Sequence, residues 1–142
     1  MNTIRIMVID DFKNALHLWK NTEGIGLTGS DDSRKSIKKF LEMNPRTCFV
    51  AENDNGELTG TIMGGTDGRR GHIYHLTVKP EYRRQGLGKK LLEKTEKAFK
   101  KEGIRKTFLV ALRNNKTGNK FWENNGYKIR KDLNYRDKWI DE

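Results

Sequence analysis

The sequence is poor in the residues that build covalent and metal-bound frameworks. Cys48 is the one cysteine among 142 residues. The chain can therefore form neither an internal disulfide nor a cluster of cysteines around a metal. We expect a reducing, cytoplasmic setting and no metal cofactor.

Long apolar runs are missing too. No stretch approaches the roughly 20 apolar residues that a membrane-spanning helix needs, and the mean hydropathy is −0.89. The N-terminal segment MNTIRIMVIDDF has neither the basic start nor the long apolar run of an export signal. The sequence thus predicts a protein with no export signal and no membrane partner.

Segments that would separate domains are also lacking. The two prolines, Pro45 and Pro80, stand far apart, and the chain has no repeat, no low-complexity tract and no linker rich in Pro, Gly or Ser. A chain of this length fits one compact domain. We expect a single domain over residues 1–142.

Positive charge, by contrast, is abundant and unevenly placed. Lys and Arg total 29 against 19 Asp and Glu, which gives a formal net charge of +10. Residues 83–106 contain ten basic and three acidic residues, so this segment alone carries +7. Such a field attracts the phosphates of a nucleotide cofactor or of a nucleic acid, but a solvated lysine-rich helix face has the same composition. Charge alone does not choose between these readings.

The residue pattern in the first half of the chain predicts a strand and two helices, followed by hairpins. Apolar alternation predicts a strand over residues 4–9, and a helix begins at Asp10. Residues 30–32 are predicted to cap a second helix, which Pro45 ends. From residue 47 the period changes to that of strands, and turn residues at 54–56 and 67–71 predict three consecutive antiparallel strands.

The second half predicts a long amphipathic helix between two strands. Leu87, Leu91, Leu92, Thr95, Ala98 and Phe99 share one helix face, and Gly103 closes the helix. The apolar run at 107–112 is typical of a buried strand parallel to the segment HIYHLTV. A short helix through Phe121 and a last strand over 127–135 complete the predicted order.

The most informative pattern lies between the strand HIYHLTV and the long helix. Arg83-x-x-Gly86-x-Gly88 stands where a helix begins and where backbone N–H groups have no intrahelical partner. Glycines let an anion approach the backbone, and the helix dipole and Arg83 add positive charge. Neither a Rossmann fingerprint nor a P-loop is present. The pattern alone is short, and its position between strand and helix is what points to a phosphate site.

These residues resemble the GNAT acyltransferase superfamily, whose members transfer an acyl group from acyl-CoA to an amine. HLTVKPEYRRQGLGKKLL is similar to the central motif of that family, and NNKTGNKFWENNGYKI is similar to its second motif. GTIMGGTDGRRG with the strand after it is most similar to the YpeA-like bacterial branch and close to the ribosomal-protein acetyltransferases. The resemblance implies an α/β (α+β) single-domain fold: a mixed central sheet of six to seven strands, about four flanking helices and a V-shaped splay between two parallel strands.

The resemblance also implies a site for acetyl-CoA as cosubstrate. Backbone groups of Thr77 and Val78 would meet the pantetheine arm, and the loop from Arg83 to Lys89 would hold the pyrophosphate. Asn115 and Trp122, on the second motif, would contact the cofactor as well. The implied cofactor residues are Thr77, Val78, Arg83, Arg84, Gln85, Gly86, Leu87, Gly88, Lys89, Asn115 and Trp122.

The position of the usual general acid differs from the family pattern. Members of the family usually have a tyrosine that protonates the departing thiolate, whereas Trp122 stands at the aligned position. An indole N–H donates a hydrogen bond but is no acid at useful pH. Tyr135, Tyr127 or water could take the role, and packing in the core is the alternative reading of Trp122.

A general base must deprotonate the attacking amine, and the motif strand carries no acid. His72 and His75 on that strand and Glu52 on the neighbouring strand are the candidates, each with a structural role as the alternative. Four acidic residues could attract a cationic amine, or be simply solvated: Glu23, Asp31, Asp32 and Asp67. Direct transfer in the family and the apolar surroundings of Cys48 speak against an acyl-enzyme on that thiol.

The predicted function is acetyl-CoA-dependent acetylation of a primary amine, by direct attack in a ternary complex. The acceptor is a small molecule, a protein N-terminus or a lysine, and the protein is a monomer or a homodimer. Two alternatives stay open: a catalytically weak CoA-binding sensor, and a basic module that binds nucleic acid. The basic helix lacks interleaved aromatic residues and the chain lacks a nucleic-acid motif, so we expect no nucleic-acid partner.

Overall fold

The computed structural model describes residues 1–141 in two compact units. The first unit is Met1–Val110, and the second begins at Ala111. The first unit holds a sheet with three helices, and the second holds one helix followed by an extended segment. The single domain over 1–142 therefore stays a prediction.

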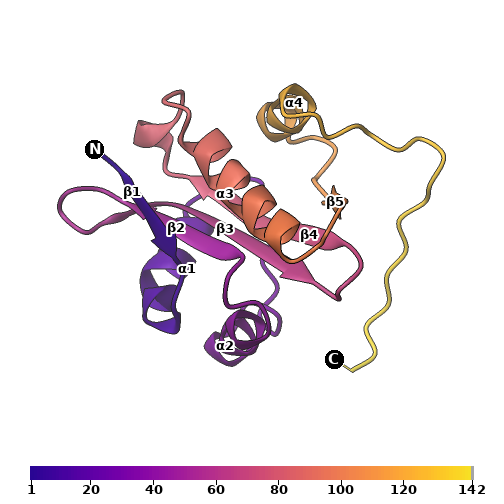
Figure 1. The fold of residues 1–142 in the computed structure, drawn as a ribbon, viewed down its shortest axis with the longest axis horizontal. Helices are drawn as coiled ribbons and strands as arrows, with labels where there is room; N and C mark the ends of the chain where they lie inside the picture. Colours follow the sequence, from indigo (N-terminus) through magenta and orange to yellow (C-terminus); the bar gives the residue numbers. More distant parts are fainter. Residues whose placement is uncertain (142) are drawn as a thin grey trace. The chain divides into compact units, whose positions relative to one another are not determined.

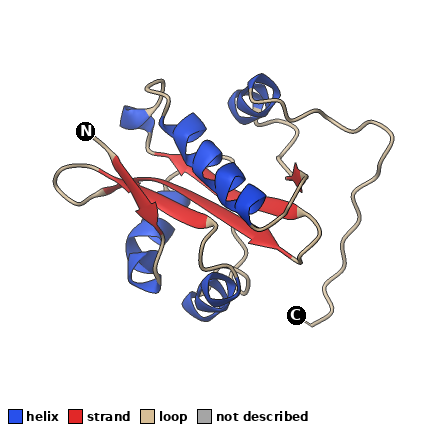
Figure 2. Ribbon diagram, in the orientation of Figure 1, coloured by secondary structure: helices blue, strands red, loops and turns tan. Residues whose placement is uncertain are grey.

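The first unit is built on a mixed five-stranded sheet (Figures 1 and 2). The strands lie in chain order, with antiparallel neighbours throughout except for the last pair, which is parallel. The strands are β1 (Thr3–Ile6), β2 (Cys48–Glu52), β3 (Leu58–Thr66), β4 (Gly71–Val78) and β5 (Thr107–Phe108). The predicted mixed α/β fold is confirmed, but the sheet has five strands among the described residues rather than six to seven.

Side chains of turn residues fix both hairpins where the sequence predicted them. Between β2 and β3, Asn53 Oδ1 accepts hydrogen bonds from the backbone N–H groups of Asn55 and Glu57. Between β3 and β4, Asp67 Oδ1 accepts from the N–H groups of Arg69 and Arg70. Such side-chain bonds replace ladder bonds that a tight turn cannot make.

The helices begin and end close to their predicted positions. They are α1 (Phe12–Lys20), α2 (Arg34–Met43) and α3 (Leu87–Lys101) in the first unit and α4 (Lys116–Asn124) in the second. A 3₁₀ turn at Ile9–Asp11 leads into α1 and shortens the strand predicted over 4–9. Residues 30–32 were the wrong cap for α2, because Ser33 accepts the bond from Ser36 N–H.

Helix α3 covers one face of the sheet, and α1 and α2 lie on the other (Figure 1). The α3 face has glycines where the helix comes closest: a Cβ at Gly64 would lie 2.6 Å from Thr95 Cγ2, and one at Gly71 would lie 2.7 Å from Phe99 Cε2. On the other face, Trp19 of α1 is buried against Thr61 of β3. Residues of β4 therefore face α3 on one side of the sheet and α1 and α2 on the other.

One strand prediction is confirmed in part and another was wrong. The predicted parallel pairing of the segment after α3 with β4 is confirmed, but its predicted length and burial are not. The strand predicted over 107–112 ends at Phe108, and Val110 and Leu112 are exposed. Residues 127–135 form no strand, and Ile129 and Leu133 are exposed there. An apolar pattern forms a strand only where a neighbouring strand completes its hydrogen bonds, and the described residues offer no such neighbour to residues 109–112 or 127–135.

The close approach of α3 predicts a strong effect of Gly64→Ala. The added methyl group would lie 2.8 Å from the backbone oxygen of Thr47, and overpacked cores lose about 1–3 kcal/mol. Gly29→Ala is the matched control, because nothing lies within 4 Å of its added Cβ. Urea unfolding should show that loss for Gly64→Ala and a change below about 0.5 kcal/mol for Gly29→Ala. Equal stability of the two variants would contradict the packing of α3 on this face.

Candidate functional site

Strand β4 carries a β-bulge at His75. Thr61 of β3 pairs with Thr77, and Met63 pairs with Tyr74, so Ile62 faces two residues of β4 rather than one. His75 has a φ of 47°, in the left-handed region that side chains rarely adopt. Bulges redirect side chains and are frequent beside active sites. The bulge brings the His75 ring next to α1.

A chain of buried hydrogen bonds holds the bulge in place. The Thr61 hydroxyl donates to the backbone oxygen of His75 at 2.8 Å, and the indole N–H of Trp19 donates to that hydroxyl at 2.9 Å. Both Trp19 and Thr61 are fully buried. The Trp19 and His75 rings also contact each other, with centroids 4.6 Å apart. The strained backbone at His75 is thus fixed from β3 and α1.

The imidazole of His75 is paired with Asp32, from the loop between α1 and α2. His75 Nε2 lies 2.6 Å from Asp32 Oδ1, and the two side chains are 14% and 10% exposed. Asp32 Oδ2 accepts a hydrogen bond from Thr28 N–H. Sequence reasoning missed this pair, because 43 residues separate its members and no periodicity relates them.

The other two candidate bases have different surroundings. The ring of His72 stacks on Tyr74, with centroids 4.0 Å apart, and contacts Phe108. Burial lowers the pKa of His72 below its ordinary value, which favours the neutral form of the ring. Glu52 accepts hydrogen bonds from Arg5 of β1. Since β3 separates β2 from β4, Glu52 lies two strands away from His75.

The Arg83–Lys89 segment turns the chain sharply into α3. A 3₁₀ turn at Pro80–Tyr82 precedes it, and both Arg84 and Gly86 have positive φ, 63° and 76°. Gly86 is the N-cap of α3 and supplies no side chain to the first N–H groups of the helix. A Cβ there would find nothing within 4 Å. Gly86 is exposed, whereas Leu87 is buried. The start of α3 is therefore a set of backbone donors that no side chain caps.

The edge of β4 leads to these donors. β5 pairs with β4 at Gly71 and His72 only, so the rest of β4 continues beyond that pairing. Lys79 N–H donates to Thr59 O of β3, and because strand amides alternate in direction, the Val78 amide points to the opposite edge. Arg83 Nε donates to Val78 O at 3.0 Å. The open edge of β4 and the start of α3 thus form one continuous stretch of backbone.

Helix α4 of the second unit carries the remaining motif. Asn115 caps the helix by accepting from Gly118 N–H at 3.0 Å, and a Cβ at Gly118 would lie 2.5 Å from Asn115 Nδ2, which explains the glycine there. Trp122 is half-buried and contacts Phe121 and Tyr127.

Tyr135 lies in the extended segment after α4. It is 69% exposed, and its hydrogen bond with Asp137 raises the pKa of its hydroxyl above the ordinary value. A raised pKa makes Tyr135 a weaker proton donor than a free tyrosine. This partner was not predicted, because Asp137 lies outside both family motifs.

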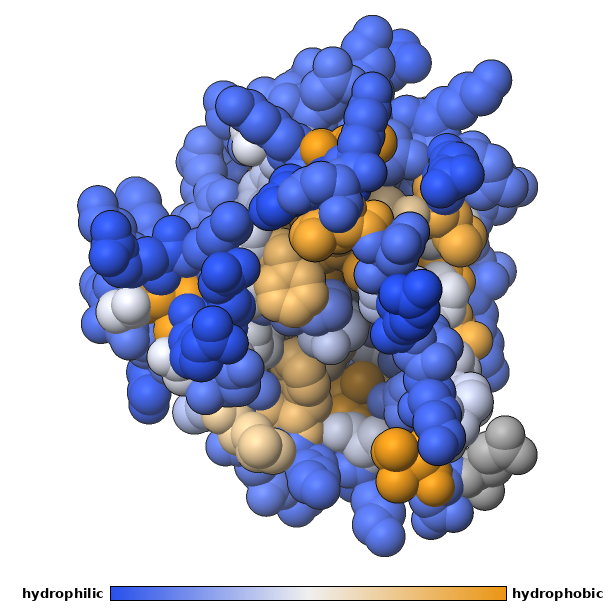
Figure 3. All heavy atoms as spheres, turned by 90° about the vertical axis from the view of Figure 1, so that its right-hand side faces the viewer, coloured by the Kyte–Doolittle hydropathy of each residue, from blue (hydrophilic) through white to orange (hydrophobic). Residues whose placement is uncertain are grey.

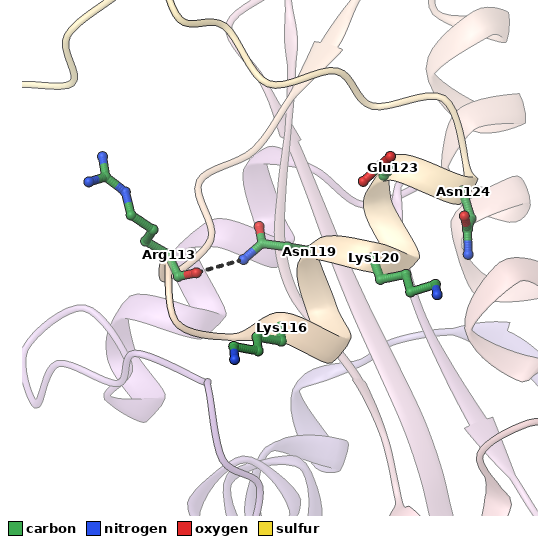
Figure 4. Close-up of a pocket in the computed structure, with 6 residues that line it drawn as sticks. All are labelled: Arg113, Lys116, Asn119, Lys120, Glu123 and Asn124. Carbon is green, nitrogen blue, oxygen red and sulfur yellow. Dashed lines mark hydrogen bonds between the residues drawn. The ribbon is translucent and has the colours of Figure 1, made fainter.

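A surface pocket of about 410 Å³ lies beside α4. Arg113, Lys116 and Lys120 supply positive charge there, but Figure 4 shows that their charged ends point in different directions. The amide of Asn119 is turned to the backbone oxygen of Arg113, 3.4 Å away. These cations share no common point for an anion, so the pocket is not part of the candidate site.

Residues 1–141 show no feature of a metal site and no membrane-spanning helix. That part of the chain holds no cluster of His, Cys, Asp and Glu that could ligate a metal ion. None of its helices is long and apolar enough to cross a membrane. On the face in Figure 3, hydrophilic side chains cover most of the surface, with apolar ones exposed between them.

Comparison with known proteins identifies the family. The sequence model of the acetyltransferase (GNAT) family matches residues 13–127. The chain belongs to the GNAT family. It is 36% identical to an acetyltransferase of Pectobacterium atrosepticum, over 79% of this chain and 77% of that protein. It is 37% identical to an acetyltransferase of Photorhabdus laumondii, over 79% of this chain and 76% of the relative. The YpeA-like branch stays a prediction.

Solved GNAT structures share the fold. The PaiA N-acetyltransferase of Thermoplasma acidophilum, solved in complex with coenzyme A, has a TM-score of 0.77 at 25% identity and covers 92% of this chain and 91% of its own. Ard1 of Thermoplasma volcanium also has a TM-score of 0.77, at 18% identity, over 88% of this chain and 81% of its own. The second likeness concerns the fold alone.

The surroundings of Cys48 make that thiol unreactive in this GNAT protein. The side chain is fully buried on β2, and burial raises the pKa of the thiol to about 12. The nucleophilic thiolate is therefore scarce near neutral pH. A disulfide reagent at pH 8 should leave the folded protein unmodified and label one thiol per chain after unfolding in urea. Rapid labelling of the folded protein would contradict this burial.

The hydrogen bonds of Thr61 predict coupled losses of stability. Thr61→Val leaves the buried Trp19 N–H without an acceptor, and such a loss costs about 1–3 kcal/mol. Trp19→Phe removes that donor. The double variant should lose less stability than the two single losses combined, because the second change removes a bond that is already broken. Strictly additive losses in urea unfolding would show that the two side chains do not interact.

Proposed function

We propose that this protein is an acetyl-CoA-dependent N-acetyltransferase that acetylates a primary amine by direct attack in a ternary complex. One observation carries the proposal: β4 runs past the end of its pairing with β5 and leads into the N-terminus of α3, which no side chain caps. Membership of the GNAT family gives this arrangement its chemical meaning.

The residues present fit acetyl-CoA. The pyrophosphate would bind the N–H groups at the start of α3, where Gly86 leaves the backbone open and the helix dipole favours an anion. The Val78 N–H, on the open edge of β4, is a donor for the pantetheine arm. Bound there, acetyl-CoA supplies an acetyl group activated as a thioester. Asn115 and Trp122 are proposed cofactor contacts from the family motif.

Side chains of this protein and water would accept and supply the protons of the reaction. A protonated amine cannot attack, so a base must take a proton first. His75 is the proposed base, because the bulge turns its ring to the α1 side, away from the α3 face of the sheet. From the family motif, the Trp122 indole N–H is proposed as a hydrogen-bond donor for the departing sulfur, and water is the proposed final proton source.

The acceptor is proposed only as a primary amine, on a small molecule or on a protein. A solved aminoglycoside acetyltransferase from a soil metagenome shares the fold with a TM-score of 0.74, but its identity of 18% carries no substrate across. A cytoplasmic location and a monomeric or homodimeric state belong to the same proposal.

The role of the α3 N-terminus is tested by a matched pair of glycine variants. Gly86 and Gly103 have similar φ angles, 76° and 80°, and open space at their Cβ positions, but they stand at opposite ends of α3. Gly86→Glu should weaken acetyl-CoA binding at least about 100-fold, because its carboxylate takes the place of the pyrophosphate. Gly103→Glu carries the same backbone strain and should bind like the wild type.

Isothermal titration of both variants with acetyl-CoA measures the difference, at a temperature where each is folded. Equal affinity of Gly86→Glu and the wild type would refute the phosphate site. Equal weakening of both variants would point to strain in α3 rather than to a lost anion site.

Trp122→Tyr separates an enzyme from a CoA-binding sensor. A tyrosine there restores the usual acid of the family, so turnover should rise while acetyl-CoA affinity stays within about twofold. General acids contribute about 10²–10⁴ in rate, and a thiol leaving group places the gain at or below the low end. Steady-state kinetics on an amine panel provides the measurement. Tight acetyl-CoA binding without turnover by either form would favour the sensor.

A further inference from the structure

We propose that Asp32 is a positioning residue for His75: it holds the ring so that Nδ1, rather than Nε2, accepts the proton of the acceptor amine. This inference rests on the proposed function and adds to it the loop between α1 and α2. It assigns the ring nitrogen, its tautomer and the residue that fixes both.

The first step is the identity of the bonded nitrogen. A carboxylate oxygen only accepts hydrogen bonds, so the 2.6 Å contact with Asp32 Oδ1 requires that His75 Nε2 carries a hydrogen. In a neutral imidazole with hydrogen on Nε2, the lone pair is on Nδ1. Among the described residues, Nε2 is the ring nitrogen of His75 with a hydrogen-bond partner. Nδ1 is therefore the atom left to act as a base.

The second step is the rigidity of the pair. The other carboxylate oxygen of Asp32 accepts from Thr28 N–H at 2.8 Å, which fixes the carboxylate within its own loop. The Trp19 ring packs against the imidazole, and Thr61 holds the backbone oxygen of His75. Both members are largely buried, so water competes weakly for their hydrogen bond. Asp32 and Trp19 thus hold the imidazole ring, and Thr61 holds the backbone that carries it.

With its lone pair on Nδ1, His75 can take part in the transfer of the acetyl group as a base. Nδ1 takes a proton from the ammonium group of the acceptor, and the freed nitrogen lone pair attacks the thioester carbonyl carbon. The new C–N bond replaces the C–S bond, whose electron pair leaves with sulfur. The attacking nitrogen releases its second proton to water, and the thiolate takes up one proton from water, so that the amide, the free thiol and one proton on His75 are formed. His75 is then an imidazolium with hydrogen on both nitrogens, and the negative charge of Asp32 stabilises it. Solvent removes the proton before the next turnover.

A direct test is the protonation pattern of the His75 ring in the wild-type protein. Nitrogen-15 NMR of labelled protein should find hydrogen on Nε2, with a downfield, slowly exchanging N–H proton, and none on Nδ1. This readout needs neither acetyl-CoA nor a variant. A hydrogen on Nδ1, or rapid exchange between the two neutral forms, would overturn the proposal.

The kinetic test compares two neighbouring aspartates. Asp32→Asn keeps the shape of the side chain, but its one oxygen cannot serve both His75 and Thr28. It should lower kcat at least about tenfold, a part of what a general base contributes, and should weaken the Nε2 proton signal. KM for acetyl-CoA should stay within about twofold. Asp31→Asn, an exposed change in the same loop, is the control and should alter none of these values.

The outcomes separate this inference from the proposed function. Full kcat in Asp32→Asn would overturn the role of Asp32 even if the enzyme acetylates amines. If the wild type acetylates no amine but shows the expected ring pattern, the proposed function fails, and the role of Asp32 in catalysis fails with it. If Asp32→Asn does not fold, the wild-type ring pattern still decides the tautomer.

Discussion

The hydrogen bond from the Thr61 hydroxyl to the His75 backbone oxygen is the constraint that fixes the bulge in β4. It holds a histidine in a left-handed conformation that would otherwise be unfavourable. Before the bulge, β4 pairs with β5 as well as with β3. After it, Thr77 resumes pairing with β3, while the other edge of β4 runs on alone to the start of α3. One local irregularity thus lies between the ordinary part of the sheet and the part that we propose for acetyl-CoA.

The two faces of the sheet have different surroundings. The α3 face is tightly packed, with glycines at the points of closest approach. On the opposite face, the ring of His75 from β4 contacts Trp19 of α1 and pairs with Asp32 of the loop between α1 and α2. We propose that the acetyl donor lies along the edge between these faces and that the acceptor amine enters on the α1 side. Cys48 is buried with a raised pKa and takes no part.

The sequence predicted features that depend on neighbouring residues. The turns rest on Asn53 and Asp67, the amphipathic α3 follows from its own periodicity, and the Arg83–Gly88 pattern marks the helix start. The bulge was out of reach, because nothing local distinguishes a positive φ at His75 from an ordinary strand residue. The Asp32 pair was missed for the same reason, since tertiary folding alone brings its members together. The strand predicted over 127–135 was wrong, because apolar alternation says nothing about whether a partner strand exists.

The most direct test of the account is amide hydrogen exchange, measured by NMR residue by residue with and without coenzyme A. Coenzyme A should slow exchange at Val78 and at Leu87, Gly88 and Lys89, the donors on the open edge of β4 and in the first turn of α3. Exchange at Gly103, at the far end of α3, should stay unchanged. Binding of coenzyme A that protects other segments, with these four amides unchanged, would contradict the account.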